Sequence, residues 1–128
     1  MTAEEFKSWL EAYGRAWMDR DAKAAADLFA QGGTYQVTPF EEPMHGRDAI
    51  YGYWRGITET EENIRFDFEI LAADAEVGIA HWWASFVRIP PGSETRLDGI
   101  FLISLGPDGR CKSLREWWVK KQPEPTEG

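Results

Sequence analysis

Three side chains in the sequence could carry acid–base chemistry: a histidine, an aspartate and a tyrosine. His81 and Asp98 lie on two consecutive predicted strands, joined by a turn at Pro90-Pro91-Gly92. If the turn is centred near Pro91, residue 101 lies opposite His81, and Asp98 is within reach only diagonally, at about 7 Å. A carboxylate orients an imidazole and favours its cation, so this pair could act as a general acid or base. The alternative is that His81 is a half-exposed sheet residue and Asp98 a charge at a strand edge.

Tyr13 is the third candidate catalytic residue. It belongs to a stripe of large apolar side chains at helical spacing, from Phe6 through Trp9 and Leu10 to Trp17. From this stripe, a tyrosine hydroxyl can donate a hydrogen bond to the carbonyl oxygen of a bound molecule. The alternative is a core tyrosine whose hydroxyl bonds a backbone group.

Aromatic residues are the outstanding feature of the composition. Seven Trp, seven Phe and four Tyr in 128 residues must line a core, a cavity or an interface. Adjacent residues of a strand face opposite sides, so Trp82 and Trp83 must diverge, as must Trp117 and Trp118. One member of each pair should line a cavity. The other should form an exposed patch, which predicts a homodimer through the outer sheet face. The candidate ligand-binding residues are Trp17, Tyr35, Trp54, Trp83, Arg115, Glu116 and Trp118.

Charged residues near the end of the chain have competing interpretations. Arg115 and Glu116 are neighbours on the last predicted strand. An inward Arg115 would suit a carboxylate ligand, whereas an inward Glu116 would suit a base or an amine ligand. The alternative is a salt bridge on the surface. The glutamates at 59, 61 and 62 are interpreted as a solvated charge run.

Several classes of function are disfavoured by charge and motif content. A formal net charge of -8 argues against nucleic acid or an anionic membrane as a partner. Two widely separated histidines without spaced carboxylates do not make a metal site. No glycine-rich phosphate loop is present, and no cofactor is expected. No apolar run approaches the roughly 18 residues of a membrane span, and no signal-peptide pattern is seen. The single Cys111 cannot form an internal disulfide, which indicates a reducing, cytoplasmic location.

The periodicity predicts one α+β domain over residues 1–120 and a disordered tail over 121–128. Thr2 and Glu5 form a capping box for the first helix, and Asp21 caps a second helix that ends at Gly32-Gly33. A short strand at 34–38, a loop, and a third helix from Gly46 follow.

After residue 63 the apolar period changes to two. It predicts strands near 64–70, 77–89, 95–105 and 110–119, joined by short turns. The resulting order, ααβαββββ, describes three N-terminal helices packed on one face of a curved, mostly antiparallel sheet.

This order and three local stretches resemble the nuclear transport factor 2-like superfamily, in particular its SnoaL-like branch. The stretches are 13–30 (YGRAWMDRDAKAAADLFA), 35–54 (YQVTPFEEPMHGRDAIYGYW) and 98–118 (DGIFLISLGPDGRCKSLREWW), and the resemblance covers roughly 6–120. It implies a cone with one open end, lined by helices and the concave sheet face, and commonly a dimer through the convex face. The family spreads over isomerases, cyclases, dehydratases, epoxide hydrolases and dimerising modules, so the fold does not name the chemistry.

Family mechanisms can be compared residue by residue. The steroid isomerase branch implies a helix tyrosine, matched by Tyr13, and an aspartate base where this chain has Thr38. Threonine is not a base at neutral pH, which argues against that mechanism. An epoxide hydrolase relay would combine Asp98 with Arg88 or Arg115, and a scytalone-type dehydration would use His81 with Asp98.

We therefore expect an aromatic-lined pocket for a small, mostly apolar organic ligand. If the pocket is catalytic, the resemblance implies cofactor-independent acid–base chemistry such as isomerisation, dehydration, cyclisation or epoxide hydrolysis. The alternative is a non-catalytic dimeric binding or interaction module, which Thr38 and the doubled tryptophans favour. An interior filled by the protein's own side chains would support this alternative.

Overall fold

The structure, a computed structural model, describes residues 1–121. The expected disordered tail therefore lies outside the described residues, except for Lys121, which ends the last strand. The elements in chain order are α1 (Ala3–Met18), α2 (Ala22–Asp27), β1 (Phe29–Gln36), β2 (Met44–His45), α3 (Arg47–Thr60), β3 (Glu61–Ala73), β4 (Gly78–Arg88), β5 (Ser93–Leu105) and β6 (Cys111–Lys121).

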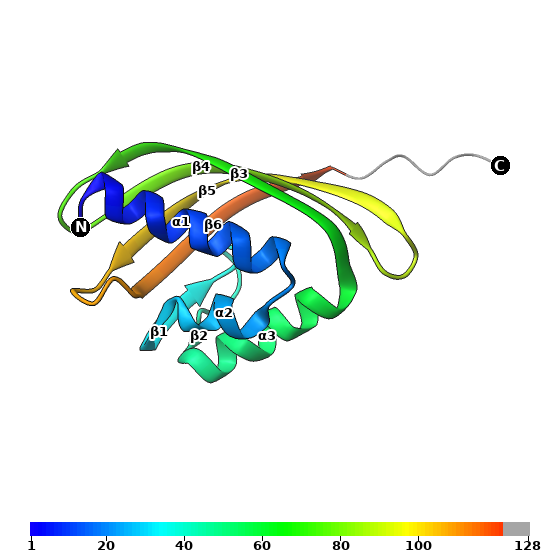
Figure 1. Cartoon of the computed structure of the whole chain (residues 1–128), viewed down its shortest axis with the longest axis horizontal. Helices are drawn as coiled ribbons and strands as arrows, with labels where there is room; N and C mark the ends of the chain where they lie inside the picture. The colour runs from blue at the N-terminus through cyan, green and yellow to red at the C-terminus, as the bar shows by residue number, and fades with distance from the viewer. Residues whose placement is uncertain (122–128) are drawn as a thin grey trace.

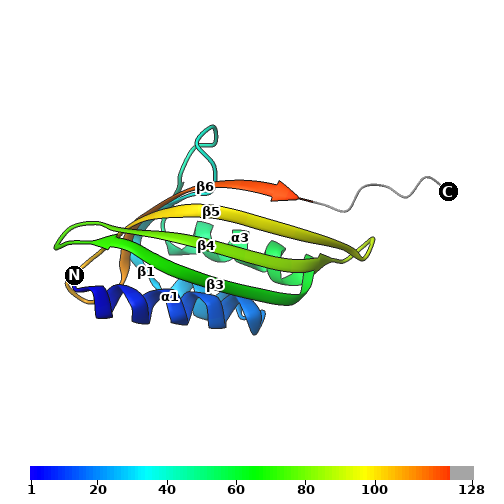
Figure 2. The same cartoon turned by 90° about the horizontal axis from the view of Figure 1, so that it is seen from above.

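The strands form one six-stranded sheet in the order β2-β1-β6-β5-β4-β3. Every neighbouring pair is antiparallel except β1 and β6, which are parallel. The sheet arches over α1, with α2 and α3 below it (Figure 1), and α1 runs alongside β3 (Figure 2). The prediction of an α+β fold with helices on a curved, mostly antiparallel sheet is confirmed.

The predicted helix caps are present. Thr2 and Glu5 bond each other's backbone N–H groups, which completes the capping box of α1. Asp21 accepts a hydrogen bond from the Ala24 N–H at the start of α2. Among residues 1–121 no helix is long and apolar enough to cross a membrane.

The boundary between α2 and β1 differs from the prediction. The helix ends at Asp27, and Gly32 and Gly33 lie inside β1 instead of terminating the helix. Phe29 pairs with Cys111 of β6, and the register shifts between Phe29 and Thr34. A Cβ on Gly33 would lie 2.8 Å from the Cys111 carbonyl oxygen, so this glycine lets the irregular strand approach β6. The predicted loop after residue 38 also contains the short strand β2.

Side chains of the long strands alternate between the helix-covered face and the outer face. On β3, Ile64, Phe66, Phe68 and Ile70 pack against the core, as predicted, while the residues between them are exposed. Helix α1 comes close to this face at Gly14, where a Cβ would lie 2.5 Å from the Phe66 ring. The interior is thus built largely from aromatic rings contributed by α1, α3 and the concave side of the sheet.

Candidate active site

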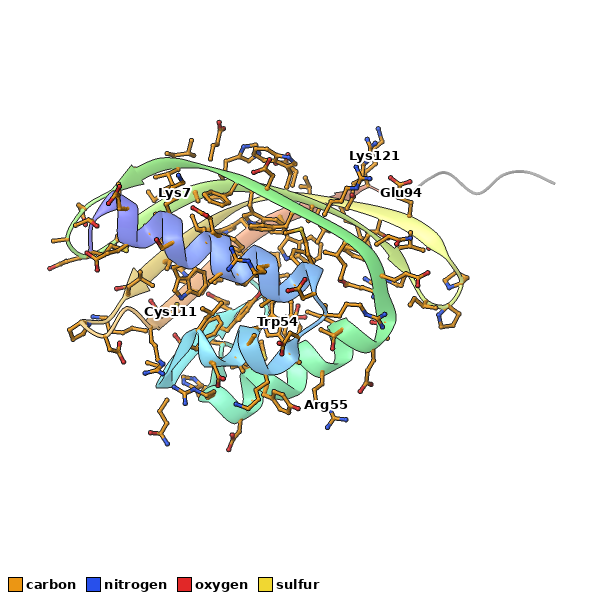
Figure 3. All side chains as sticks on the ribbon, in the orientation of Figure 1. Lys7, Trp54, Arg55, Glu94, Cys111 and Lys121 are labelled. Carbon is orange, nitrogen blue, oxygen red and sulfur yellow. The ribbon has the colours of Figure 1, made fainter. Side chains whose placement is uncertain are left out.

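A pocket of about 350 Å³ lies between the helices and the concave face of the sheet. This volume is in the range of small-molecule sites, so the interior is not completely filled by its own side chains. Trp54, labelled in Figure 3, is buried and points from α3 toward this interior. Eight of the 17 lining residues are aromatic: Tyr13, Trp17, Tyr35, Tyr53, Trp54, Trp82, Phe86 and Trp118.

The paired tryptophans diverge to opposite faces, as strand geometry requires. Trp82 and Trp118 line the pocket, whereas Trp83 and Trp117 lie on the outer face, each 38% exposed. This placement differs from the expectation that Trp83 is a pocket residue. Strand alternation requires that two adjacent tryptophans face opposite sides of the sheet. Which of the two faces the pocket depends on the register that the preceding turn sets.

A buried carboxyl group lies at one end of a hydrogen-bonded chain in the pocket. Glu116 is 5% exposed, and its Oε1 accepts a hydrogen bond from the Tyr35 hydroxyl at 3.3 Å. The Tyr35 and Tyr13 hydroxyl oxygens are 3.1 Å apart. Burial raises the pKa of Glu116 well above its usual range, against the smaller, opposite effect of the Tyr35 hydrogen bond. Glu116 therefore holds its proton at a pH where an exposed glutamate is ionised.

The two tyrosines are also neutral. Burial, followed by the nearby Glu116 carboxyl, raises the pKa of Tyr13 and Tyr35 well above the usual value for tyrosine. With Tyr35 donating to Glu116, the Tyr35 oxygen is free to accept from Tyr13. The chain Tyr13–Tyr35–Glu116 then leaves the acidic proton of Glu116 available to a molecule in the pocket.

A second carboxyl group, Glu61, lines the same pocket at the start of β3. It is 4% exposed, and its Oε1 accepts a hydrogen bond of 2.9 Å from Trp17 Nε1. Burial raises its pKa, while the Trp17 hydrogen bond and the charge of Arg88 act in the opposite direction. The interpretation of Glu61 as part of a solvated charge run is therefore wrong. The helix ends at Thr60, so Glu61 is already an inward strand residue opposite Arg88.

Two indole groups in the wall lack hydrogen-bond partners. The Nε1 atoms of Trp54 and Trp82 are buried and meet no acceptor within residues 1–121. An unmatched buried donor costs free energy, commonly about 1–3 kcal/mol.

The predicted histidine–aspartate pair forms, but on the other side of the sheet. His81 lies opposite Ile100, one residue from the expected position, and Asp98 lies opposite Trp83. The diagonal contact is present, with Asp98 Oδ1 3.0 Å from His81 Nε2, and Glu69 Oε1 lies 3.1 Å from Nδ1. Desolvation alone would lower the pKa of His81, but hydrogen bonds to the two carboxylates raise it overall. His81 and Asp98 are thus separated by the sheet from Tyr13 and the pocket.

A family model described as a SnoaL-like domain matches residues 10–114. The chain belongs to this family. The SnoaL-like fold, part of the nuclear transport factor 2-like superfamily, confirms the resemblance carried by the sequence. No curated protein sequence matches this SnoaL-like chain.

Two solved structures show the same SnoaL-like architecture. One is SalBIII, described as an epoxide hydrolase/cyclase-like enzyme in pyran ring formation in the polyether salinomycin. It has a TM-score of 0.80, 19% identity, and coverage of 93% of this chain and 95% of that chain. The other is a candidate isomerase from Bacillus subtilis, with a TM-score of 0.78, 20% identity, and coverage of 91% and 87%. At these identities the comparison shows the fold.

The remaining predicted ligand residues of the SnoaL-like domain divide between the two faces. Trp17, Tyr35 and Glu116 line the pocket. Arg115 lies outside it, donates to Gln36 Oε1 at 3.1 Å and stacks on Trp117 with its guanidinium carbon 4.9 Å from the ring centre. Within residues 1–121, no group of three His, Cys, Asp or Glu side chains is arranged to hold a metal ion. The pocket instead offers neutral proton donors and carboxyl groups.

Proposed function

We propose that this SnoaL-like protein is a cofactor-independent acid–base enzyme acting on a small, mostly apolar organic molecule that carries an oxygen function. The carrying observation is the buried carboxyl group of Glu116, which accepts a hydrogen bond from Tyr35 in an aromatic-lined pocket and whose pKa is raised by burial. Environments that push the pKa values of carboxyl groups away from their usual range are typical of acid–base enzymes.

In this proposal Glu116 is the general acid. Its proton is offered to an epoxide, carbonyl or leaving hydroxyl oxygen of the substrate, while Tyr35 and Tyr13 orient the carboxyl group. Tyr13 keeps the role expected from the sequence, whereas His81 and Asp98 have none in this pocket.

Glu61 is the candidate general base. Burial raises the pKa of Glu61, but the hydrogen bond from Trp17 and the charge of Arg88 act in the opposite direction, and Glu116 has no cation in the place of Arg88. A base facing a pocket acid can remove a proton from the substrate carbon, from water or from an internal hydroxyl group. These steps correspond to isomerisation, epoxide hydrolysis and cyclisation respectively. The similarity to SalBIII and to the candidate isomerase supports this range of reactions.

A panel of styrene oxide, cyclohexene oxide and 3-cyclohexen-1-one, followed by gas chromatography with mass spectrometry, tests the proposal. We expect turnover of at least one compound and a decrease of about 100-fold or more in kcat/KM for Glu116→Gln. Glu94→Gln, an exposed β5 variant labelled at the surface in Figure 3, is the matched control and should retain activity. Undiminished turnover by Glu116→Gln, with circular dichroism unchanged, would refute the assignment.

The outer face supports a second proposal, that two copies of this chain associate through it. Trp83 and Trp117 are each 38% exposed there, and Val119 is 72% exposed. Around these apolar side chains lie both cations and anions, including Arg96 and Asp98, so a two-fold related copy can match opposite charges. We also propose a cytoplasmic location, which suits the buried, unpaired Cys111.

Light scattering coupled to gel filtration checks the association. The double variant Trp83→Ser/Trp117→Ser should elute with the mass of one chain, whereas wild type should elute with the mass of two. Phe40→Ser is the control, because Phe40 is fully exposed on the loop between β1 and β2, away from the outer face. A wild-type mass of one chain would rule out the dimer and with it the non-catalytic dimeric module.

A further inference from the structure

Two cations, Arg88 and Lys120, line the pocket beside its aromatic wall. Arg88 is the last residue of β4, and Lys120 is the second-last residue of β6. Because β4 and β6 are both antiparallel to β5, they run in the same direction and end at the same end of the sheet. Arg88 is half-buried and lies two residues beyond Phe86, whereas Lys120 lies two residues beyond Trp118 and is exposed at the rim, where it also borders the outer face. One end of the pocket is therefore positively charged in a chain whose net charge is -8.

Neither cation is neutralised by an ion pair inside the described part of the chain. No carboxylate of residues 1–121 lies within 4.0 Å of the Arg88 or Lys120 nitrogens. Arg88 sits opposite Glu61 in the sheet, yet Glu61 Oε1 accepts its hydrogen bond from Trp17. The guanidinium carbon of Arg88 lies 5.3 Å from the centre of the Phe86 ring, which positions the group along the wall.

The charge of Arg88 reaches the interior of the pocket. Burial raises the pKa of both Glu61 and Tyr53, and the charge of Arg88 acts in the opposite direction on each. Glu61 lies opposite Arg88 in the sheet, and Tyr53 also lines the wall. Beside aromatic side chains, with little water, such a charge is screened less than on an open surface. An arginine fork and a flexible lysine together are a common way to hold an anionic group.

Apart from Glu61, which lies opposite Arg88, the polar groups of the pocket are separated by type. Neutral donors, Glu116, Tyr13 and the two unmatched indoles, lie among the aromatic rings, and the two cations lie at the strand ends. We infer that the substrate is an amphipathic organic anion, with an apolar ring or chain against the aromatic wall and a carboxylate held by Arg88 and Lys120. This inference rests on the proposed function in that it takes the Glu116 pocket as the substrate site. The oxygen function of the substrate would then lie at the end of the molecule opposite its carboxylate, next to Glu116.

Binding of a matched pair of probes tests the inference. The pair is 4-phenylbutyrate and 4-phenylbutanamide, which differ in charge and little in shape. In isothermal titration calorimetry at pH 7 and 50 mM salt, we expect the acid to bind wild type at least 10-fold more tightly than the amide. The double variant Arg88→Gln/Lys120→Gln should lose this preference and bind the amide as wild type does. Raising the salt to 500 mM should also reduce the preference.

The control is Arg65→Gln/Lys121→Gln, which removes the same charge from the outer face of the sheet and should keep the preference. Lys120→Gln alone changes an exposed residue and serves if the Arg88 variant does not fold. Equal affinity for the two probes, a preference that survives in the double variant, or no binding of either probe would overturn the inference. The proposed chemistry fails by a different readout, since Glu116→Gln should keep the acid preference while losing turnover.

Discussion

Replacing Glu116 by glutamine should remove one contribution to the free energy of unfolding that falls as pH rises. In the folded protein this carboxyl is protonated because burial raises its pKa, whereas in the unfolded chain it has an ordinary pKa near 4.3. Above that pH, unfolding releases a proton, so the free energy of unfolding falls as pH rises toward the folded-state pKa. Glutamine keeps the shape of the side chain and an acceptor for the Tyr35 hydroxyl, but does not titrate.

The magnitude follows from the number of protons released. One proton corresponds to about 1.4 kcal/mol per pH unit, so the Glu116 contribution changes by up to about 2.7 kcal/mol between pH 5 and pH 7. The hydrogen bond from Tyr35 is the one effect that opposes the rise in the pKa of Glu116 caused by burial. The neighbouring Tyr13 and Tyr35 stay neutral throughout this pH range. The variant should therefore gain stability relative to wild type as the pH is raised.

Urea unfolding of wild type, Glu116→Gln and Glu94→Gln at pH 5, 6, 7 and 8 measures the effect. His81 titrates in the same range, but it does so in all three proteins and cancels in the differences. The Glu94→Gln curve should run parallel to wild type, because this residue is exposed. A constant difference between Glu116→Gln and wild type across the four pH values would show that the buried carboxyl is ionised, and the proton-donor argument would fail.

Three further predictions concern packing and local electrostatics. Gly14→Ala should lower the free energy of unfolding by about 1–3 kcal/mol, because the new methyl group would meet Phe66. Gly52→Ala adds a methyl group in open space and should be neutral or stabilising by roughly 1 kcal/mol. Equal urea midpoints for the two variants would contradict this prediction. Trp17→Phe should raise the pKa of Glu61 by removing a hydrogen bond to its carboxylate, which carbon NMR of the side-chain carboxyl would show as a titration shifted upward. Asp98→Asn should lower the pKa of His81, measured by proton NMR of the imidazole, while Glu94→Gln should leave it unchanged. Because the folded-state pKa of His81 is raised, the associated stabilisation is present at acid pH and is lost as pH rises through that pKa. A measured pKa at or below 6.5 for His81 in wild type would contradict this prediction.

Much of the sheet was predictable because each long strand alternates over many residues. The expected contact between His81 and Asp98 followed from turn position alone and was found at hydrogen-bond distance. Alternation could not predict which face of each strand points toward the helices and the pocket. The pair was expected in the pocket and lies outside it, as do Trp83 and Arg115. Relative facing is a local property, whereas the choice of inner face depends on how the sheet meets the helices.

The missed carboxyl group has a similar origin. Glu61 follows directly after α3, in a segment whose composition is that of a solvated surface. Its burial comes from the immediate change of helix into strand and from contact with Trp17, 44 positions earlier in the chain. The wrong prediction that the helix ends at Gly32-Gly33 has a similar cause, since Gly33 allows a close approach to Cys111 of β6, which is distant in the sequence. Long-range contacts of this kind leave no local period in the sequence.

Trp82 and Trp118 line the pocket, whereas Trp83 and Trp117 lie on the outer face, so residues that are adjacent in the sequence serve different surfaces. Substitutions at even-numbered positions of β4, and of β6 from Leu114 onward, change the side facing the helices, and those at odd-numbered positions change the outer face. Point mutations can therefore change the pocket lining and the outer face independently of each other. Deleting or inserting one residue in either strand would exchange the two sets at once, so natural variation should preserve the length of these strands more strictly than their composition.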